Sequence, residues 1–554
     1  MIRLLLISIF CLCTSCVSNH ILKHYSSAEY SPIDTTALVT VNDSLHVLAH
    51  TKDYLVRNKY GNWELYVSGN PDEIGDKMGL LSGELIQAQR RYFMDKLEDI
   101  VPSPTRRKWI MRFVHWYNRR LDNYIPEQYL TEMYALSRHM DSSYAFAGSP
   151  FQQTLYMHAA HDLGHALQDL AIVGCSSAAS WGAKTPDGEL LIGRNFDFYL
   201  SDDFSKNKVI YFVRPEKGIP FMSVSWPGMV GVVSGMNLEG LTITMNAGKS
   251  VVPLSAKTPI SLIALEILEH ASTIEEAIAI AKNRKPFVSE SLMIGSAKDH
   301  KAVLLELSPK NFGVYDVTEQ QQLICTNHFQ SAAYNSDKRN TQHIRDSHSQ
   351  YRHEHLQELL AQKDPLTPSR MVDILRDRKG LHDEDIGLGN DKSLTHLLAH
   401  HAVVFQPEKK RVWVSNSPYQ LGAFTAYDLR KVFADSSSRT QSKAIDSLTI
   451  AADPFLQTAA YRQYEQYRQE SARIEHLLKS GTETLSPEDI ENYKALNPKL
   501  WYVYYLSGQY QLKEKNYGEA LADFEAALDK EIPTAQARRH IEQLRNKAKK
   551  KWKR

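Results

Sequence analysis

The sequence predicts a layered α+β sandwich built around stacked antiparallel sheets. Between residues 175 and 246, short segments rich in β-branched and aromatic residues alternate with turn sequences such as Pro186-Asp187-Gly188. Beyond this region, a pair of helical segments at 260–270 and 274–282 precedes further strands. Runs of strands combined with paired helices are typical of sheets that bury one face on each other and the other under helices. Helical patterns flank this core on both sides.

The length and composition indicate a folded chain of several parts. Its 554 residues exceed one typical domain, and 43% hydrophobic and 23% charged residues lie near globular averages. We divide it into a signal at 1–16, a largely helical segment at 17–174, a core at 175–447 and a helical region at 448–554. The net charge of +1 provides no general attraction to nucleic acid, so no nucleic-acid partner is expected.

The first residues are typical of an export signal. Arg3 is followed by an apolar run at 4–12, and Thr14 and Ser15 precede Cys16. This pattern resembles a bacterial lipoprotein cleavage box, although Cys13 stands where leucine is usual. The resemblance implies acylation of Cys16 and a lipid-anchored protein of the bacterial cell envelope, on the periplasmic or outer-membrane face. An ordinary secretory peptide and an uncleaved anchor are the alternatives.

The remaining elements follow from periodicity and turn residues. Residues 19–68 have mixed, strand-like sequence with a turn at 60–63, and residues 71–172 have helical spacing. Strands are expected at 190–193, 209–213, 222–226, 241–245, 291–294, 302–308, 323–325, 402–405 and 411–415, with a helix at 369–376.

The C-terminal region carries small and large residues at positions that resemble one tetratricopeptide repeat. These residues are Tyr504, Gly508, Tyr517, Ala520, Phe524, Ala527 and Pro533. One repeat cannot bury its own face, so we expect it to pack on 453–478 or on 541–552. This region is a candidate for contact with a protein partner, and a plain helical extension is the alternative.

Two cysteines keep a thiol once Cys11 and Cys13 leave with the signal and Cys16 is acylated. Cys175 follows Gly174 and precedes strand-forming sequence, whereas Cys325 lies in an apolar run. Two thiols do not make a disulfide scaffold, so either they pair with each other or at least one is kept for its chemistry. A thiol has a pKa of about 8.5 and needs a base to act as a nucleophile at neutral pH. Cleavage of the Gly174–Cys175 bond would place an α-amine, with a pKa of about 7.7 to 8.0, beside the thiol.

Three motifs around this cysteine occur in a recognisable order. They are Cys175-Ser176-Ser177, Asp187-Gly188 and Gly193-Arg194-Asn195-Phe196-Asp197-Phe198. Further segments upstream (69–75 and 125–127) and downstream (237–246 and 325–329) extend the similarity to about residues 63–415. The chain thus resembles the N-terminal-nucleophile hydrolases related to penicillin acyl-coenzyme A acyltransferase (peptidase family C45) and choloylglycine hydrolase, with acid ceramidase more distant.

This resemblance implies a four-layered αββα sandwich and a self-processing cysteine amidohydrolase or acyltransferase. Cys175 would be the nucleophile after cleavage at Gly174, and Asp197 would hold its α-amine. Arg194 would balance charge beside the thiol, and Asn246 and Asn327 would contact the tetrahedral intermediate. The family's late arginine has no clear counterpart here, and Lys392 and His396 are the nearest candidates. No cofactor or metal is implied, and the substrate would be an N-acyl amide.

Each assignment has a simpler interpretation. Cys175 is alternatively a buried small residue, Arg194 and Asp197 an ordinary ion pair, and Asn246 and Asn327 turn residues. A competing enzyme class starts from His158, His161 and His165, whose spacing places them on one helix face as in a zinc hydrolase; His396, His400 and His401 are similarly spaced. A third possibility is a non-catalytic surface lipoprotein whose helical tail binds a partner.

Overall fold

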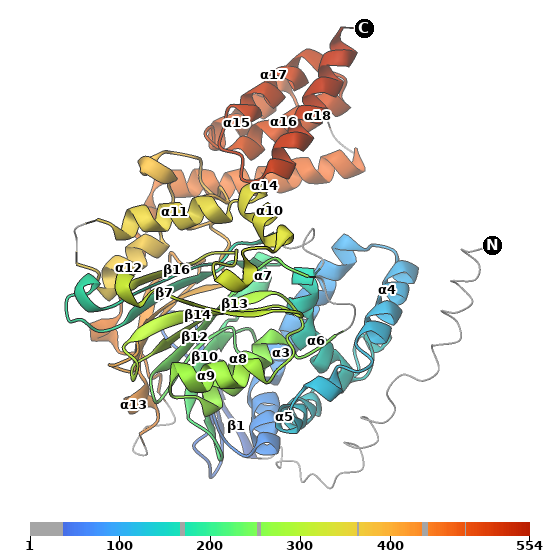
Figure 1. Ribbon diagram of the computed structural model, residues 1–554. Coiled ribbons are helices and arrows are strands. Elements are labelled where there is room, and N and C mark those ends of the chain that lie inside the picture. Colours follow the sequence, from blue (N-terminus) through green and yellow to red (C-terminus); the bar gives the residue numbers. More distant parts are fainter. Residues whose placement is uncertain are drawn as a thin grey trace.

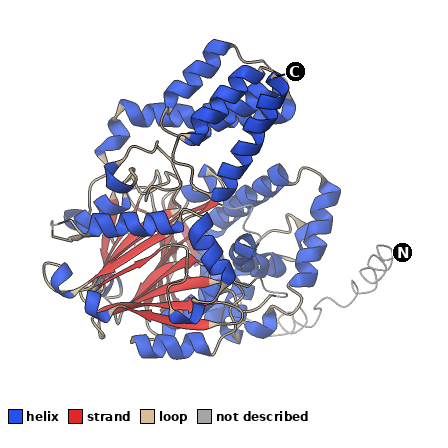
Figure 2. Cartoon of the chain, turned by 45° about the horizontal axis from the view of Figure 1, so that its top comes forward, coloured by secondary structure: helices blue, strands red, loops and turns tan. Residues whose placement is uncertain are grey.

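The computed structural model describes residues 37–166, 172–251, 256–362, 365–434, 441–481 and 484–553. Two β-sheets lie face to face at its centre, with helices on both outer sides (Figure 2). Cys16 and the rest of the predicted signal fall outside the described residues. Among the helices that are described, none is both long and apolar enough to cross a membrane.

The larger sheet has eleven strands in the order β1-β2-β3-β4-β9-β10-β11-β12-β13-β14-β15. They are β1 (Leu38–Asn42), β2 (Leu45–Leu48), β3 (Tyr54–Arg57), β4 (Trp63–Gly69), β9 (Val209–Pro215), β10 (Phe221–Ser225), β11 (Ser234–Asn237), β12 (Leu241–Ala247), β13 (Glu290–Ser296), β14 (Lys301–Leu307) and β15 (Phe312–Asp316). All neighbours pair antiparallel except β4 and β9, which are parallel. The segment before Gly174 therefore contributes four strands to the same sheet as the segment after it.

The smaller sheet has six antiparallel strands in the order β16-β6-β7-β17-β18-β19. They are β16 (Gln322–Cys325), β6 (Ser176–Ser180), β7 (Leu191–Phe196), β17 (His401–Gln406), β18 (Arg411–Ser415) and β19 (Phe424–Asp428). A two-stranded ribbon joins β5 (Ile172–Val173) to β8 (Phe198–Tyr199). Most of these strands were predicted, because their sequences combine β-branched residues with flanking turns.

The two sheets share one apolar core. Residues of the larger sheet, including Ile210 and Phe212, pack with residues of the smaller sheet, including Ile192 and Val403. Helices α8 (Ile260–His270) and α9 (Ile274–Lys282) cover the larger sheet. Helices α11 (Ser349–Leu360) and α12 (Pro368–Leu375) cover the smaller one. This arrangement confirms the predicted four-layered αββα sandwich.

The helices before Gly174 form a group beside the larger sheet (Figure 1). They are α3 (Pro71–Ile100), α4 (Pro104–Tyr117), α5 (Glu127–Ser137) and α6 (Pro150–Ala166). Short helices α7 (Asp202–Lys206), α10 (Lys338–Asp346) and α13 (Leu429–Val432) occur later in the chain. Asn70 caps α3 through a capping box with Glu73, which explains why this helix begins directly after β4.

The C-terminal region is helical, as predicted. It comprises α14 (Ala459–Ser480), α15 (Pro487–Leu496), α16 (Trp501–Lys513), α17 (Tyr517–Leu528) and α18 (Ala535–Trp552), which project from the sandwich (Figure 1). A Cβ placed on Gly508 would lie 2.7 Å from the ring of Phe524, so α16 and α17 approach closely at this glycine. A small residue of α16, Gly508, thus packs against a large residue of α17, Phe524, as the repeat-like pattern requires.

Candidate active site

Cys175 lies between β5 and β6, at the start of a central strand of the smaller sheet. The register of β6 and β7 pairs Ser177 with Arg194, which brings the predicted site residues of the two strands together. The N–H of Gly174 donates to the carbonyl of Asp197 at 3.3 Å. Cys175 and Cys325 are both free thiols, so the two cysteines do not pair as a disulfide.

Arg194 is fully buried beside the thiol. Its Nη2 lies 3.8 Å from Cys175 Sγ and also donates to the carbonyl of Met245. Its Nη1 donates to the Val233 carbonyl at 3.0 Å and to Ser234 Oγ at 2.5 Å. These acceptors hold the guanidinium in one orientation, with one edge toward the sulfur.

The Cys175 thiol is itself a weak acid in this setting. Burial raises its pKa to about 11, although the charge of Arg194 acts in the opposite direction. The thiol is therefore protonated at neutral pH and needs a base before it can attack a carbonyl.

Asp197 is the carboxyl group among the predicted site residues. It is fully buried, and burial raises its pKa to about 8 while Arg352 and Arg194 oppose the rise. Within the described part of the chain, neither of its carboxylate oxygens accepts a hydrogen bond. A buried acceptor without a donor is unusual and often marks a functional position.

Arg352 is a second buried arginine at this site, and no sequence motif indicated it. Its Nη1 donates to the Cys175 carbonyl and to Ser176 Oγ, both at 2.7 Å. Its Nη2 donates to Asn327 Oδ1 at 2.6 Å. One guanidinium thus joins the nucleophile strand to Asn327, in a forked geometry that a lysine cannot reproduce.

The two candidates that the sequence offered for a late cation lie in different surroundings. Lys392 forms an ion pair with Glu531 and lies over the Tyr351 ring, so its ammonium is engaged with these residues. His396 does lie in the site, where its Nδ1 is 3.7 Å from Asp197 Oδ2. Burial, together with Arg352, lowers its pKa to about 3, so it is neutral at physiological pH. Arg352 is the buried arginine from the later part of the chain that contacts Cys175, through its carbonyl.

His396 also contacts the residue before the nucleophile. A Cβ built on Gly174 would lie 2.4 Å from His396 Cε1, closer than side chains approach. A side chain at this position would therefore have to displace the imidazole, which glycine avoids.

Asn246 and Asn327 lie near the nucleophile strand, but both side chains are engaged with protein groups. Asn246 accepts a hydrogen bond from Ser177 Oγ at 2.8 Å and donates to the Cys325 carbonyl at 3.0 Å. Asn327 Nδ2 donates to the Ala247 carbonyl at 3.1 Å. Their predicted contact with a tetrahedral intermediate stays a prediction.

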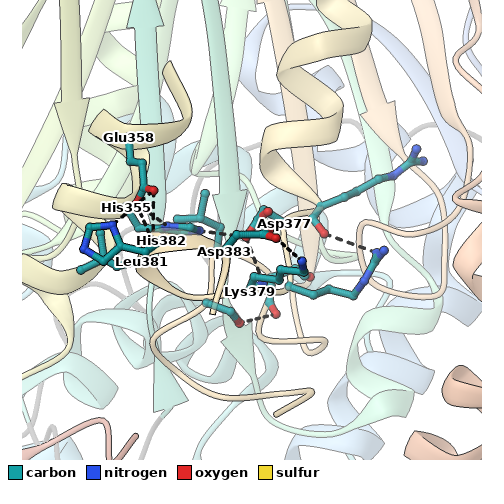
Figure 3. Close-up of polar contacts among 12 residues, drawn as sticks. His355, Glu358, Asp377, Lys379, Leu381, His382 and Asp383 are labelled. Carbon is teal, nitrogen blue, oxygen red and sulfur yellow. Dashed lines mark hydrogen bonds and ion pairs between the residues drawn. The ribbon is translucent and has the colours of Figure 1, made fainter. Parts of the chain in front are cut away.

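A polar cluster holds the helix that carries Arg352 (Figure 3). His355 Nε2 lies 2.8 Å from Asp377 Oδ1, and the N–H of His382 donates to Glu358 Oε2 at 2.9 Å. The carbonyl of Asp377 in turn accepts from the N–H of Thr395, next to His396, at 2.9 Å. The same aspartate thus connects α11 to the loop that carries His396.

The geometry gives little support to the zinc alternative. Both ring nitrogens of His158 are engaged, because Nδ1 lies 2.8 Å from the Thr154 carbonyl and Nε2 accepts from the Val230 N–H at 2.8 Å. The side chains of His161 and His165 lie outside what the structure describes. Within the described residues, no group of three or more His, Cys, Asp or Glu is arranged to hold a metal.

His400 and His401 form a separate buried pair behind Arg194. His400 Nδ1 lies 2.8 Å from His401 Nδ1, and His401 Nε2 lies 2.9 Å from Ser234 Oγ, which also accepts from Arg194. These histidines support the arginine through the serine.

Comparison with known proteins adds family information. Residues 183–417 match the family described as acyl-coenzyme A:6-aminopenicillanic acid acyl-transferase. This match confirms the resemblance predicted from the sequence; it begins eight residues after Cys175. An uncharacterized protein of Archaeoglobus fulgidus is 23% identical over 286 residues, covering 48% of this chain and 46% of that protein. Protein dcd1B of Dictyostelium discoideum is 24% identical over 275 residues, covering 46% and 51%. The chain therefore matches about half the length of these relatives.

Two solved structures have weaker similarity to the chain. The Caenorhabditis elegans N-acylethanolamine-hydrolyzing acid amidase ortholog is 17% identical, with a TM-score of 0.32, covering 42% of this chain and 93% of that one. A mutant conjugated bile acid hydrolase from Clostridium perfringens is 15% identical, with a TM-score of 0.32, covering 49% and 95%.

Proposed function

Because residues 183–417 match the acyl-coenzyme A:6-aminopenicillanic acid acyl-transferase family, we propose that this chain is an N-terminal-nucleophile enzyme acting on the linear amide bond of an N-acyl amide. Cys175 is its nucleophile, and the enzyme either hydrolyses the amide or transfers its acyl group. The observation that carries this proposal is the surroundings of Cys175. Buried Arg194 lies at its thiol, buried Arg352 binds its carbonyl, and the buried Asp197 accepts no hydrogen bond among the described residues.

The first step is self-cleavage. Cys175 Sγ attacks the Gly174 carbonyl carbon, and the bond from that carbon to the Cys175 nitrogen breaks as the proton of the thiol passes to that nitrogen. A thioester then joins Gly174 to Sγ, and water hydrolyses it to a Gly174 carboxylate and a free thiol. The N-terminal amine of Cys175 is the product that matters for later turnover.

The new amine supplies two groups that the site lacks before cleavage: a base for the thiol and a hydrogen-bond donor for Asp197. It is a base within the same residue as the thiol, with a typical pKa of about 7.7 to 8.0, and so removes the need for a catalytic histidine. As an ammonium it is also a donor of the kind that Asp197 lacks among the described residues of the intact chain. We propose that Asp197 accepts this donor, while Arg194 and Arg352 stabilise the thiolate and the adjacent carbonyl.

Turnover then follows the usual order for acyl transfer through cysteine. Cys175 attacks the amide carbonyl, an acyl-enzyme thioester forms, and the amine departs with a proton from the α-ammonium. Water or a second amine resolves the thioester. Asn327 would contribute an oxyanion donor if its amide exchanged the Ala247 carbonyl for the intermediate, and Asn246 would support the same region.

The decisive experiment compares the two free cysteines. The wild-type protein should give two fragments on a denaturing gel, and the larger one should begin at Cys175 by N-terminal sequencing. Cys175→Ala should stay intact and release no amine from bile-acid conjugates, N-acyl amino acids, penicillins or lipid amides. Cys325→Ala, which alters the other buried thiol, should cleave and act normally. An intact wild-type chain would contradict self-cleavage, and amine release by Cys175→Ala would contradict the nucleophile assignment.

We also propose that the mature protein is tethered to the cell envelope through an acylated Cys16. The support for this is the sequence pattern around that residue. Metabolic labelling with a radioactive fatty acid should mark the wild type but not Cys16→Ser. Contact of the C-terminal helices with a protein partner is proposed from the repeat-like pattern alone.

A further inference from the structure

Helix α4 presents an unusual outer surface. Its side chains Trp109, Ile110 and Phe113 are 55%, 40% and 47% exposed, and no residue of this helix is buried. Large apolar side chains exposed on three neighbouring positions are uncommon on a protein surface that meets only water. Figure 1 places α4 at the outer edge of the molecule.

The helix is nevertheless firmly attached through its inner face. His115 Nε2 lies 3.1 Å from the Ala147 carbonyl, and its ring lies 5.1 Å from that of Tyr156. The Tyr117 ring lies 5.8 Å from that of Phe287, beyond the predicted cleavage point. The exposed face is therefore displayed by a fixed helix.

The charges on the outer face have one sign. Arg106, Lys108 and Arg112 are exposed among the apolar residues, and the Arg112 guanidinium lies 5.1 Å from the Trp109 ring. The sequence of the helix contains no Asp or Glu. Basic residues mixed with tryptophan and other large apolar residues are typical of helices that lie in a membrane interface.

We propose that α4 lies on the surface of a bilayer that contains anionic lipids. Trp109, Ile110 and Phe113 enter the boundary between headgroups and acyl chains, and the three exposed basic residues of the helix contact lipid phosphates. A lipid surface is the chosen occupant because the helix carries basic residues and no Asp or Glu, and basic residues beside apolar ones are attracted to anionic membranes. If the chain is also tethered through Cys16, the helix supplies a second attachment to the same surface.

The test is flotation of the full chain with vesicles. All samples carry Cys16→Ser, so that acylation at this residue contributes to none of them. One set of vesicles is phosphatidylcholine alone, and the other contains about 30% phosphatidylglycerol, which makes its surface anionic. The parent should float with the anionic vesicles, and less so as salt is raised. Trp109→Ser/Ile110→Ser/Phe113→Ser should lower the ratio of bound to free protein at least tenfold.

Two further variants distinguish the basic residues of α4 from its apolar residues, and α4 from the rest of the surface. Arg106→Gln/Lys108→Gln/Arg112→Gln should lose the preference for anionic vesicles and its salt dependence. The second variant, Val39→Ser/Val41→Ser/Val314→Ser, removes three exposed apolar residues outside α4 and should float like the parent.

Two outcomes would overturn the proposal. One is equal flotation of the parent and the apolar triple variant of α4. The other is a parent dimer in size-exclusion chromatography that this variant abolishes without any vesicle dependence, since the face would then join two copies of the chain.

Discussion

The two halves of the proposed active site reach Cys175 by different routes. Arg194 and Asp197 follow it within about twenty residues, and the pairing of β6 with β7 brings them to the thiol. Arg352 and His396 come from α11 and from a loop before β17, about 180 and 220 residues later. We call Arg194 and Asp197 the near half of the site, and Arg352 and His396 the far half. The position of the near half is set by the register of two neighbouring strands, whereas that of the far half depends on how a helix and a loop pack over the sheet. We infer that the near half carries the chemistry and that the far half holds the scissile residue and tunes the charge.

The largest expected effect concerns Asp197 and pH. Its folded pKa of about 8 lies above the unfolded value of about 3.9, so the folded state holds one more proton between these values. The free energy of unfolding should therefore fall as pH rises from about 4 to about 8, by up to about 1.4 kcal/mol per pH unit, and level off above that. Denaturant melts of uncleaved Cys175→Ala at several pH values measure this slope, and Cys175→Ala/Asp197→Asn should reduce it. Identical slopes in the two proteins would show that Asp197 titrates normally.

Loss of the distant arginine should almost stop self-cleavage. Arg352→Gln removes donors to the Cys175 carbonyl and to Asn327, and we expect fragment formation to slow by about a hundredfold. Arg352→Lys should recover little, because an ammonium does not reproduce the fork. Time courses on denaturing gels measure the rate. Arg345→Gln, on the neighbouring α10 and exposed, is the matched control and should cleave normally. If Arg352→Gln cleaves at the wild-type rate, the far half is not needed for processing.

The contact between Gly174 and His396 provides a sharper test of the far half. Gly174→Ala places a methyl group against the imidazole, and we expect cleavage to slow by about tenfold as the carbonyl moves away from the thiol. His396→Ala in the same chain removes the obstruction and should restore most of the rate. Gly83→Ala, at a glycine with open space around its Cβ position, should have no effect. No rescue in the double variant would mean that the glycine is required for its flexibility alone.

The same division explains what could be predicted from the sequence. Most strands of the core were predicted because their residues alternate with turn signals, and Arg194 and Asp197 because the motif that contains them resembles that of a known hydrolase family. The strands β11, β15 and β19 were not predicted. Arg352 was missed because it lies in a polar helix whose sequence resembles any solvated helix, and nothing local indicates that its side chain is buried. His396 was noted only as a candidate for the late cation and for its spacing with other histidines. The contribution of β1 to β4 to the large sheet was also missed, since a parallel pairing of β4 with β9 leaves no local signal.

The smallest expected effect lies one step further from the chemistry, in the cluster that holds α11 (Figure 3). Asp377→Asn weakens its contact with His355 while leaving its backbone bond to Thr395, so we expect a loss of about 1 kcal/mol in the free energy of unfolding and cleavage only a few times slower. Asp383→Asn, in the same cluster, removes an exposed ion pair with Lys379 and should change neither measurably. If Asp377→Asn instead slowed cleavage as much as Arg352→Gln, α11 would need this anchor to place its arginine. The far half would then depend on the cluster as a unit, and its distance from Cys175 in sequence would matter less than the rigidity of the loop that joins it to His396.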